Sequence, residues 1–314
     1  MRKDKFKVSV IIPILNEEVC IPILVDRIIV ALRDYFDYEL LFVDDGSTDN
    51  SLNKIKEIRL SDPKVHFLSF SRNFGHQNAL KAGYMYATGD CIISLDGDMQ
   101  HPPELIPQFI NKWLEGYDIV YSIRKDSGRT PFLKRVSSKL FYKLMNLVSD
   151  IKFDEGEADF RLIDKRAASE LNKLRENTIF YRGIIKWLGF NQVSIEYTPV
   201  ERKFGSTKYS RKKMVALALS GITSFSVKPL RISTFIGTTI AFLSIFYGFY
   251  ALYVRLFTNN TIEGWTSVFF MVAFIGGIQL IMIGILGEYL GKLFIESKDR
   301  PNFIIKESSL NDTN

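Results

Sequence analysis

The chain has 314 residues, of which 46% are hydrophobic and 24% are charged, and this composition fits a globular protein with room for one domain and a further segment. Its net charge of +6 does not require a nucleic-acid partner. Much of the basic excess flanks two apolar runs near the C-terminus, where anionic lipid is the simpler partner. The apolar stretch 8–15 contains Pro13 and lacks a small-residue cleavage site, which excludes a signal peptide.

From residue 7 to about residue 200, apolar β-branched runs alternate with segments of helical spacing. In chain order we expect a strand at 8–14, a helix at 17–35, a strand at 39–43, a helix at 49–60, a strand at 65–70, a helix at 78–87, a strand at 91–96, a helix at 103–114 and a strand at 118–122. Such alternation predicts parallel βαβ units, and therefore an α/β, Rossmann-like fold with a mostly parallel sheet and helices on both faces.

Two uncharged apolar runs follow, at 232–254 and 265–287. Each is about 23 residues long, enough to cross a bilayer, so they predict a transmembrane helical hairpin; the alternative is a pair of buried helices in a soluble protein. Lysines and arginines cluster before the first run and after the second, which predicts that both termini and the α/β domain are cytoplasmic in a multi-pass membrane protein. The expected divisions are a domain at 1–205, a juxtamembrane segment at 206–231, a hairpin at 232–290 and a cytoplasmic tail at 291–314.

Other patterns extend the membrane prediction. The stretches 140–148 and 215–225 have a basic flank and one apolar face, as in helices that lie among lipid headgroups, although either could be core packing. Gly287 and Gly291 form a small-xxx-small pair that indicates close helix packing or a homo-oligomer. Cys20 and Cys91 lack metal spacing and are expected to be reduced and buried. His66, His76 and His101 form no ligand pattern, and we expect none to bind metal.

Polar residues follow five successive predicted strands, and ligands collect beyond the carboxyl ends of such strands. The residues at these ends are Pro13, Asn16 and Glu17, then 44–49, then 71–75 with Arg72, then Asp96, Asp98 and Gln100, and finally Arg124. A helix N-cap would explain any one of these polar turns by itself. Five polar turns at the same edge of the sheet instead predict a ligand site.

The turn 96–100 is the clearest metal pattern in the chain. Asp96 and Asp98 are two residues apart, so both side chains leave an extended strand on the same side, Gly97 lets the backbone bend, and Gln100 adds a neutral oxygen. These hard oxygen ligands suit Mg²⁺ or Mn²⁺. Such an ion can hold a diphosphate, which suggests nucleotide-sugar chemistry.

Three motifs together carry a family resemblance. They are 10–17 (VIIPILNE), 43–49 (VDDGSTD) and 96–103 (DGDMQHPP), and they are supported by 158–162 (ADFRL), 202–209 (RKFGSTKY) and the two-run tail. In this order the chain resembles family 2 glycosyltransferases of the GT-A fold, and within them the polyprenyl-phosphate branch that includes the bactoprenol glucosyltransferases. The resemblance covers essentially the whole chain. The Gln-x-x-Arg-Trp motif of the processive polysaccharide synthases is absent from the sequence.

The resemblance implies roles for individual residues. The donor nucleotide sugar would be held by Pro13, Asn16, Glu17, Asp44, Asp45, Arg72 and Asp96, and a divalent ion by Asp96, Asp98 and Gln100. Asp159 matches the residue often proposed as the base. Because a phosphate monoester has a second pKa near 6 and arrives ionised, a strong base is not required, and we favour a positioning role for Asp159. The alternative is a carboxylate paired with Arg161.

The acceptor phosphate must be held against the charge of the donor diphosphate, and arginine binds phosphate with two donors at once. Candidates are Arg124, Arg129, Arg135, Arg202, Ser206 and Lys208, with Arg124 favoured because it ends a strand. The predicted function is therefore metal-dependent, inverting transfer of a hexose, by default glucose from UDP, to a polyprenyl phosphate such as undecaprenyl phosphate. The catalytic residues would be Asp98, Asp159 and Arg124. The alternatives are another lipid acceptor, such as diacylglycerol, or a non-catalytic module that binds nucleotide sugar or lipid.

Overall fold

The computed structural model describes residues 5–35, 37–125, 146, 154–174, 176, 180–198, 226–257 and 264–310. The chain divides into two compact units. The first contains residues 1–146, 151–214 and 300–314, and the second contains residues 147–150 and 215–299. The predicted basic stretch 140–148, apart from residue 146, and the juxtamembrane residues up to 225 lie outside the described residues, as do Arg129, Arg135, Arg202, Ser206 and Lys208.

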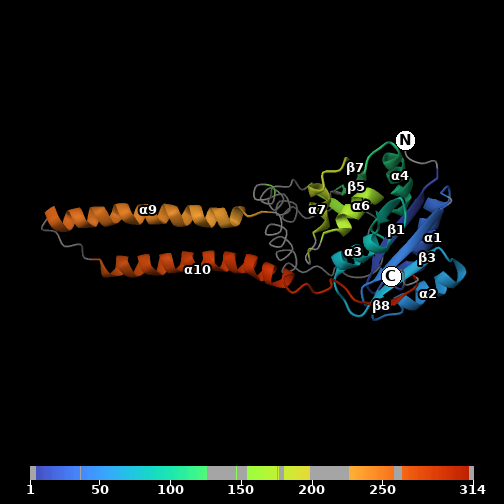
Figure 1. Ribbon diagram of the computed structural model, residues 1–314, viewed down its shortest axis with the longest axis horizontal. Coiled ribbons are helices and arrows are strands. Elements are labelled where there is room, and N and C mark those ends of the chain that lie inside the picture. The colour runs from blue at the N-terminus through green and yellow to red at the C-terminus, as the bar shows by residue number, and fades with distance from the viewer. Residues whose placement is uncertain are drawn as a thin grey trace. The chain divides into compact units, whose positions relative to one another are not determined.

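The first unit is built on a sheet whose elements follow the predicted order (Figure 1). They are β1 (Lys7–Ile14), α1 (Cys20–Leu32), β2 (Asp37–Asp44), α2 (Ser51–Ser61), β3 (Val65–Phe70), α3 (His76–Tyr86), β4 (Cys91–Ser94), the short 3₁₀ helix η1 (Pro103–Leu105), α4 (Ile106–Leu114), β5 (Ile119–Arg124), β6 (Glu157–Asp164), α6 (Lys165–Asn172), α7 (Tyr181–Trp187), β7 (Gln192–Tyr197) and β8 (Ile305–Ser308). All five strands and four helices predicted up to residue 122 are present, with ends shifted by a few residues.

The strand order in the sheet is β7-β5-β6-β4-β1-β2-β3-β8. Strands β4, β1, β2 and β3 are parallel neighbours, and β5 is parallel to β7. Strand β6 runs antiparallel to both β4 and β5, and β8 runs antiparallel to β3. The predicted fold class, an α/β protein with a mostly parallel sheet, is confirmed.

Helices cover both faces of the sheet. Helices α1, α2 and α4 pack on one face, where Leu24, Ile55 and Phe109 join the strand residues Ile12 and Phe42 in one hydrophobic cluster. Helices α3, α6 and α7 cover the other face. The sheet is therefore buried on both sides, which explains why its central strands are nearly continuous apolar runs.

On that second face, helix α3 lies close to the sheet. A Cβ added at Gly83 would come within 2.9 Å of the Ile11 side chain in β1. The rings of Tyr84 and Tyr181 lie 5.4 Å apart and connect α3 with α7. Cys20 and Cys91 are both buried and are reduced thiols, as the sequence predicts.

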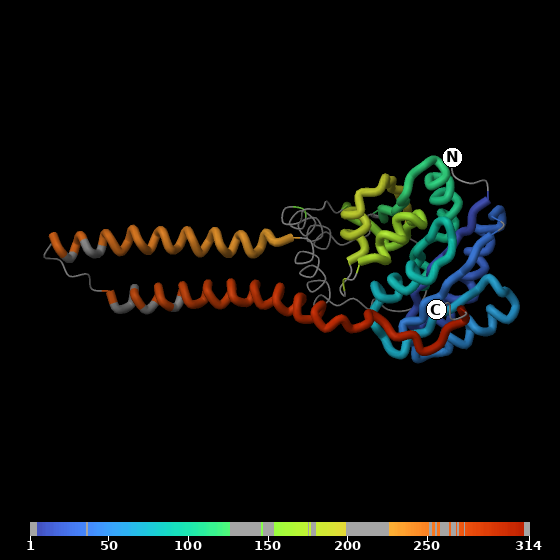
Figure 2. The backbone as a smooth tube through the Cα atoms, viewed as in Figure 1, coloured from blue at the N-terminus to red at the C-terminus, as the bar shows by residue number. Residues whose placement is uncertain are grey.

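The C-terminal strand β8 was not predicted. From residue 300 the chain runs along the sheet unit and adds β8 to the edge strand β3 (Figure 2). The ring of Phe303 stacks on Phe70 at 5.0 Å, and Ser309 bonds to the backbone of Phe67 in both directions. Lys56 of α2 pairs with Glu307 at 2.6 Å. Residues 300–310 are thus part of the sheet unit.

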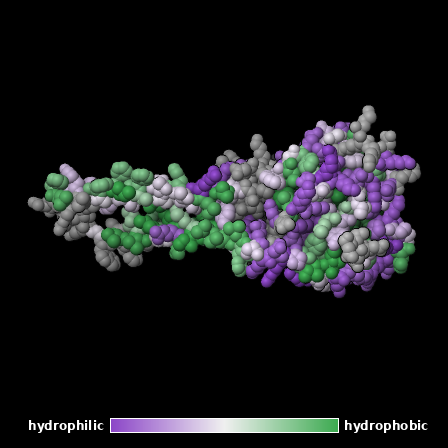
Figure 3. All heavy atoms as spheres, viewed as in Figure 1, coloured by the Kyte–Doolittle hydropathy of each residue, from purple (hydrophilic) through white to green (hydrophobic). Residues whose placement is uncertain are grey.

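The second unit contains two long helices, α9 (Lys228–Phe257) and α10 (Trp265–Glu296). They pack against each other in antiparallel directions, because Met282 approaches Gly237 while the Tyr289 hydroxyl bonds to the Ser226 carbonyl at 2.7 Å. Hydrophobic side chains cover much of their surface (Figure 3). The segments Lys228–Tyr250 and Phe270–Glu296 are long and apolar enough to cross a membrane. No atom of the described chain lies within 4 Å of a Cβ built at Gly287 or Gly291, so neither glycine packs against α9 there.

Candidate functional site

The loops that follow β1 and β2 hold each other in place at the carboxyl edge of the sheet. The Asn16 carboxamide accepts a bond from the Thr48 backbone N–H at 2.8 Å, and the Asn16 N–H donates to the Ser47 hydroxyl at 2.9 Å. The Glu17 N–H donates to Ser51 in the same way, at 2.9 Å. Asn16 has a φ of 55°, a region that asparagine tolerates well. Its position is therefore explained by this connection as well as by the predicted contact with a nucleotide.

Asp44 and Asp45 are both buried, and both accept bonds from the chain itself. Asp44 takes the Ser47 N–H at 2.9 Å on one oxygen and the Ser69 hydroxyl at 2.8 Å on the other. Asp45 takes the Phe74 N–H at 2.6 Å and the Gly75 N–H at 3.0 Å. Burial raises the pKa of Asp45 even though these two N–H groups oppose the shift. The two carboxylates shape the loops, and their assignment to the nucleotide stays a prediction.

The loop after β3 lies against the loop after β2. Gly46 has a φ of 73°, and a Cβ added there would lie 2.6 Å from the Arg72 carbonyl carbon, so only glycine fits. The guanidinium of Arg72 is exposed and stacks over the Phe74 ring at 4.2 Å. Pro13 is buried within β1. Among the residues predicted to hold the nucleotide, Glu17 and Arg72 are therefore more accessible than Pro13, Asp44 and Asp45.

The register of β4 and β6 brings Asp96 and Asp159 to the same place. Ser94, the last residue of β4, pairs with Arg161 of β6 in antiparallel register, so continuing the register by two residues sets Asp96 opposite Asp159. His76, at the start of α3, lies between them. Its Nε2 is 3.5 Å from Asp96 Oδ1 and 3.9 Å from Asp159 Oδ2.

The turn after β4 has the shape that its sequence suggests, with one difference. Gly97 has no unusual φ. A Cβ there would lie 2.8 Å from the Ile14 side chain, so its smallness is needed for packing rather than for a bend. The positive φ, 61°, is at Met99. Beyond Met99, the Gln100 N–H donates to Asp98 Oδ1 at 3.1 Å, which holds that carboxylate within the turn.

Within the described ranges, no group of three His, Cys, Asp or Glu side chains forms a metal centre. The residues nevertheless fit Mg²⁺ or Mn²⁺, because Mg²⁺ is commonly held by one or two carboxylates with water and substrate phosphates completing its coordination. Asp96 has a side chain that is 30% exposed, and Asp98 is partly exposed beside it. The ring of His101 is buried, and its Nδ1 accepts a bond from the Asp96 backbone N–H at 3.2 Å, which holds the start of the turn in place.

Asp159 is held by two arginines. Arg182 of α7 donates from Nε to Oδ1 at 3.1 Å and from Nη2 to Oδ2 at 3.0 Å, while Arg161 donates to Oδ1 at 3.1 Å. Burial alone would raise the pKa of Asp159, but the charges of Arg182 and Arg161 outweigh it and hold the pKa well below its usual range. A carboxylate held in this way is a weak base at neutral pH. The predicted pairing with Arg161 is present, and Arg182 adds a second partner.

Arg124 ends β5 at the same edge of the sheet. It is exposed and pairs in register with Tyr197, the last residue of β7. Burial raises the pKa of Tyr197 to about 12; the charge of Arg124 opposes this shift, and the charges of Asp96 and Asp98 add to it. Tyr197 therefore lies within electrostatic reach of both the acidic turn and the predicted phosphate-binding arginine.

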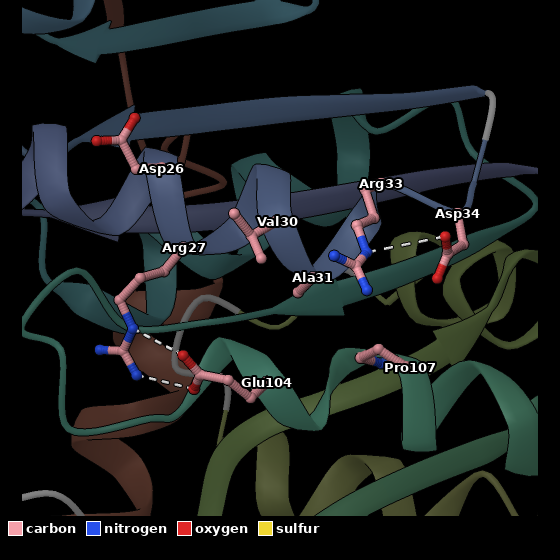
Figure 4. Close-up of a pocket in the computed structure, with 8 residues that line it drawn as sticks. All are labelled: Asp26, Arg27, Val30, Ala31, Arg33, Asp34, Glu104 and Pro107. Carbon is pink, nitrogen blue, oxygen red and sulfur yellow. Dashed lines mark hydrogen bonds and ion pairs between the residues drawn. The ribbon is translucent and has the colours of Figure 1, made fainter.

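A separate surface pocket of about 380 Å³ lies between α1 and the η1–α4 segment (Figure 4). A two-pronged pair of Arg27 with Glu104, with both distances 2.8 Å, closes one side of it. None of the predicted site residues lines this pocket. We therefore place the candidate site at the carboxyl edge of the sheet.

The described candidate residues lie at five strand ends that share one edge of the sheet, and three further side chains that the sequence analysis missed lie near them. His76 was set aside because it shows no metal spacing, although it directly follows a polar strand end. Tyr197 ends a strand that was not predicted. Arg182 carried no local signal, because only the packing of α7 on β6 brings it to Asp159.

Residues 9–171 match the protein family described as Glycosyl transferase family 2. A prophage bactoprenol glucosyl transferase homolog of Escherichia coli is 42% identical over 96% of this chain and 98% of its own. A bactoprenol glucosyl transferase of Shigella phage SfII is 41% identical over the same shares. Among solved structures, a glucosyl-3-phosphoglycerate synthase of Mycobacterium tuberculosis is 22% identical, with a TM-score of 0.47, over 69% of this chain and 78% of its own.

Proposed function

Since the chain belongs to glycosyl transferase family 2, we propose that it transfers a sugar from a nucleotide donor to a polyprenyl phosphate at a membrane surface. The observation that carries this proposal is the 41–42% identity to bactoprenol glucosyl transferases over 96% of the chain. Because the match covers 96% of the chain, it must include most of both long helices, α9 and α10. It therefore relates the sheet unit and the apolar helices together to enzymes named for a lipid acceptor.

The donor is proposed to bind at the carboxyl edge of β1, β2 and β4. The loops after β1 and β2 would contact the base and ribose. Glu17 would do so directly, while Asp44 and Asp45 would hold the neighbouring loops in the conformation that binds the nucleotide. Asp96, Asp98 and Gln100 would hold Mg²⁺ or Mn²⁺ at the diphosphate, where such an ion offsets the negative charge that develops on the leaving group. Uridine diphosphate glucose is the first donor to test.

The transfer step needs no proton acceptor on the protein. An oxygen of the acceptor phosphate forms a bond to the anomeric carbon, the bond from that carbon to the donor diphosphate breaks, and its electron pair leaves with the nucleoside diphosphate. The acceptor is a monoester with a second pKa near 6, so it attacks without first losing a proton to a base. This agrees with the low pKa of Asp159, which makes that carboxylate a weak base. Attack opposite the leaving group inverts the anomeric carbon.

The acceptor phosphate is proposed to bind Arg124, which is exposed at the end of β5 near Tyr197. An arginine suits this task because its fork can bind two phosphate oxygens. The other predicted phosphate ligands, Arg129, Arg135, Arg202, Ser206 and Lys208, lie outside the described residues and stay predictions.

Helices α9 and α10 are proposed to form a transmembrane hairpin that keeps the sheet unit at the cytoplasmic face. Their apolar side chains are exposed along most of the described length. In the sequence, lysines and arginines precede α9 and follow α10, which by the positive-inside tendency favours a cytoplasmic location for both ends of the hairpin. A lipid phosphate would then approach the site from the same surface.

The proposal can be tested with full-length protein in detergent or nanodiscs. Nucleotide sugars are first screened by thermal shift with Mg²⁺ or Mn²⁺, because a bound donor raises the unfolding temperature. The stabilising donor is then supplied with undecaprenyl phosphate, and the lipid product is identified by mass. A folded protein that makes no glycolipid with any donor would overturn the proposal.

A further inference from the structure

A ladder of opposite charges connects β6 with α7 behind the candidate site. Glu157, Asp159 and Arg161 alternate along β6 and therefore project from the same face of the strand. Arg182 and Lys186 are four residues apart on α7 and project from one side of the helix. The rungs are Arg182 with Asp159 at 3.0 Å and Lys186 with Glu157 at 2.9 Å, and Arg161 lies between the two carboxylates.

Stability alone does not explain this ladder. The side chains of Arg161 and Glu157 are 1% and 3% exposed, and replacing a buried ion pair with well-packed apolar residues is often neutral or stabilising. Among the described residues, Arg161 Nη1 also has no hydrogen-bond partner. An arrangement that apolar residues could match or improve in stability points to another use, which is to hold one member of the ladder in a fixed orientation.

The member at the site is Asp159. Its side chain is 12% exposed, and His76 lies between it and the acidic turn at Asp96. Arg182 is 30% exposed, so the pair formed by Arg182 and Asp159 is the end of the ladder that reaches the site. Arg161 and Glu157, at 1% and 3% exposed, form the inward part of the ladder.

We propose that Arg182 is a positioning residue that fixes the orientation of the Asp159 carboxylate as a hydrogen-bond acceptor for a hydroxyl group of the transferred sugar. This inference rests on the proposed function and assigns a role to a residue in the same site. The Arg182 fork takes one position on each oxygen of Asp159 and so sets the plane of the carboxylate. Oδ1 already accepts bonds from both Arg182 and Arg161, whereas among the described residues Oδ2 accepts one bond, from Arg182. A lone pair of Oδ2 is therefore left for a sugar hydroxyl.

The role differs from that of a base in a way that kinetics can detect. If Arg182 acts only through Asp159, replacing Arg182 should lower kcat in the wild-type protein. The same replacement should hardly change kcat in a protein whose Asp159 is already substituted. If Arg182 were purely structural, replacing it would instead lower the stability of the protein. The effect of that replacement would then add to the effect of a second substitution.

The test compares Arg182→Gln, Arg182→Lys, Asp159→Asn and the double variant Arg182→Gln/Asp159→Asn, all as full-length protein with undecaprenyl phosphate. We expect Arg182→Gln to lower kcat about 10- to 100-fold, the size of loss that a small misplacement causes, with the dissociation constant of the nucleoside diphosphate unchanged. Arg182→Lys, which keeps the charge but not the fork, should fall in between. The double variant should be within about twofold of Asp159→Asn.

Arg166 supplies a matched control. It binds two carboxylates, Asp164 and Asp118, on an exposed part of α6 that does not contact the site, so Arg166→Lys should keep the wild-type kcat. The inference is overturned if Arg182→Lys turns over at the wild-type rate, or if the losses at Arg182 and Asp159 multiply. If Arg182→Gln does not fold, the lysine variant decides. A folded wild-type protein that transfers no sugar overturns the proposed function itself, which separates the two failures.

Discussion

The carboxylates at the edge of the sheet fall into two groups by their hydrogen bonds. Asp44 and Asp45 are buried and accept bonds from loop N–H groups and from the Ser69 hydroxyl of β3. Asp96 and Asp98 are partly exposed in the turn after β4. The first pair therefore builds the shape of the site, while the second pair is placed to meet a ligand.

Replacing Asp98 with asparagine tests the second pair. The change keeps the size of the side chain but removes the charge that a divalent ion needs, so we expect sugar transfer to fall by about 10²- to 10³-fold, a loss comparable to that of one transition-state stabilising group. The rate of glycolipid formation at saturating Mg²⁺ is the measurement. Chelation by EDTA should stop the wild-type enzyme, and added Mg²⁺ or Mn²⁺ should restore it.

The control for this substitution is Asp26→Asn, an exposed carboxylate of α1 that lines the separate surface pocket. It should leave the transfer rate unchanged. An Asp98→Asn enzyme as fast as the wild type would remove the metal role from the turn.

At this scale the sequence singles out the candidate metal-binding carboxylates more easily than the side chains around them. Asp96 and Asp98 are conspicuous because they are polar residues that directly follow an apolar strand; their role as metal ligands stays a prediction. His76 and Arg182 could not be assigned, because their partner Asp159 is 83 and 23 positions away, as the numbering shows, and only the sheet register and the packing of α7 bring them together.

Among the elements, β8 ties the end of the chain to the sheet, and Phe303 is its main apolar contact. Because the ring stacks on Phe70 at 5.0 Å, we expect Phe303→Ala to destabilise the sheet unit by about 1–3 kcal/mol, less than the loss for a fully buried phenylalanine. Thermal unfolding of the full-length protein in detergent measures this. The neighbouring Ile304 is 51% exposed, and Ile304→Ala should have a much smaller effect. Equal effects of the two changes would contradict the proposed anchoring contact.

At the opposite end of β2, Glu39 is a buried carboxylate that connects strands. It accepts bonds from the Ser9 hydroxyl at 2.6 Å and from Thr88 at 2.7 Å and 2.8 Å, and it pairs with Lys7 at 2.7 Å. Burial would raise the pKa of Glu39, but the hydrogen bonds from Lys7, Ser9 and Thr88 outweigh burial and lower it. The ionised form is therefore the one that stabilises the fold.

A lowered pKa in the folded state means that this stabilisation is complete above the unfolded pKa near 4.5 and is lost as the pH falls through the folded value. We expect Glu39→Gln to destabilise the protein by about 1–3 kcal/mol at pH 7 and by progressively less as the pH drops below about 4.5. Unfolding measured at pH 7 and at pH 4 tests this. Glu115→Gln, at an exposed pair with Lys112, should show little change at either pH, and a pH-independent loss at Glu39 would contradict the account.

The elements differ in how well the sequence predicts them. Strands β1 to β4 are buried on both sides, so they are β-branched apolar runs that end at polar turns. Strand β6 was missed because Glu157 and Arg161 are buried in it as an ion pair, and this gives a core strand the alternation of a surface one. Strand β8 is only four residues long, and its place at the edge depends on a partner more than 200 positions earlier.

At the scale of the whole molecule, the chain combines a sheet unit whose visible surface is mostly hydrophilic with a pair of long apolar helices (Figure 3). The sequence predicts this division directly, because apolar length and charge placement are local properties. The acceptor is a different matter. The proposed polyprenyl phosphate depends on the likeness to bactoprenol glucosyl transferases and on an exposed arginine at the site, so it requires a direct comparison of acceptors.

That comparison is the most direct test of the central claim. Full-length protein, Mg²⁺ and the stabilising nucleotide sugar are incubated separately with undecaprenyl phosphate, with undecaprenol, which lacks the phosphate, and with diacylglycerol. With undecaprenyl phosphate alone, we expect a product with the mass of that lipid plus one hexosyl residue. Its anomeric linkage, read by NMR, should be β when the donor is α-linked. Comparable transfer to undecaprenol or diacylglycerol would contradict the account, because a hydroxyl acceptor needs the proton acceptor that Asp159, held by Arg182 and Arg161, is poorly suited to be.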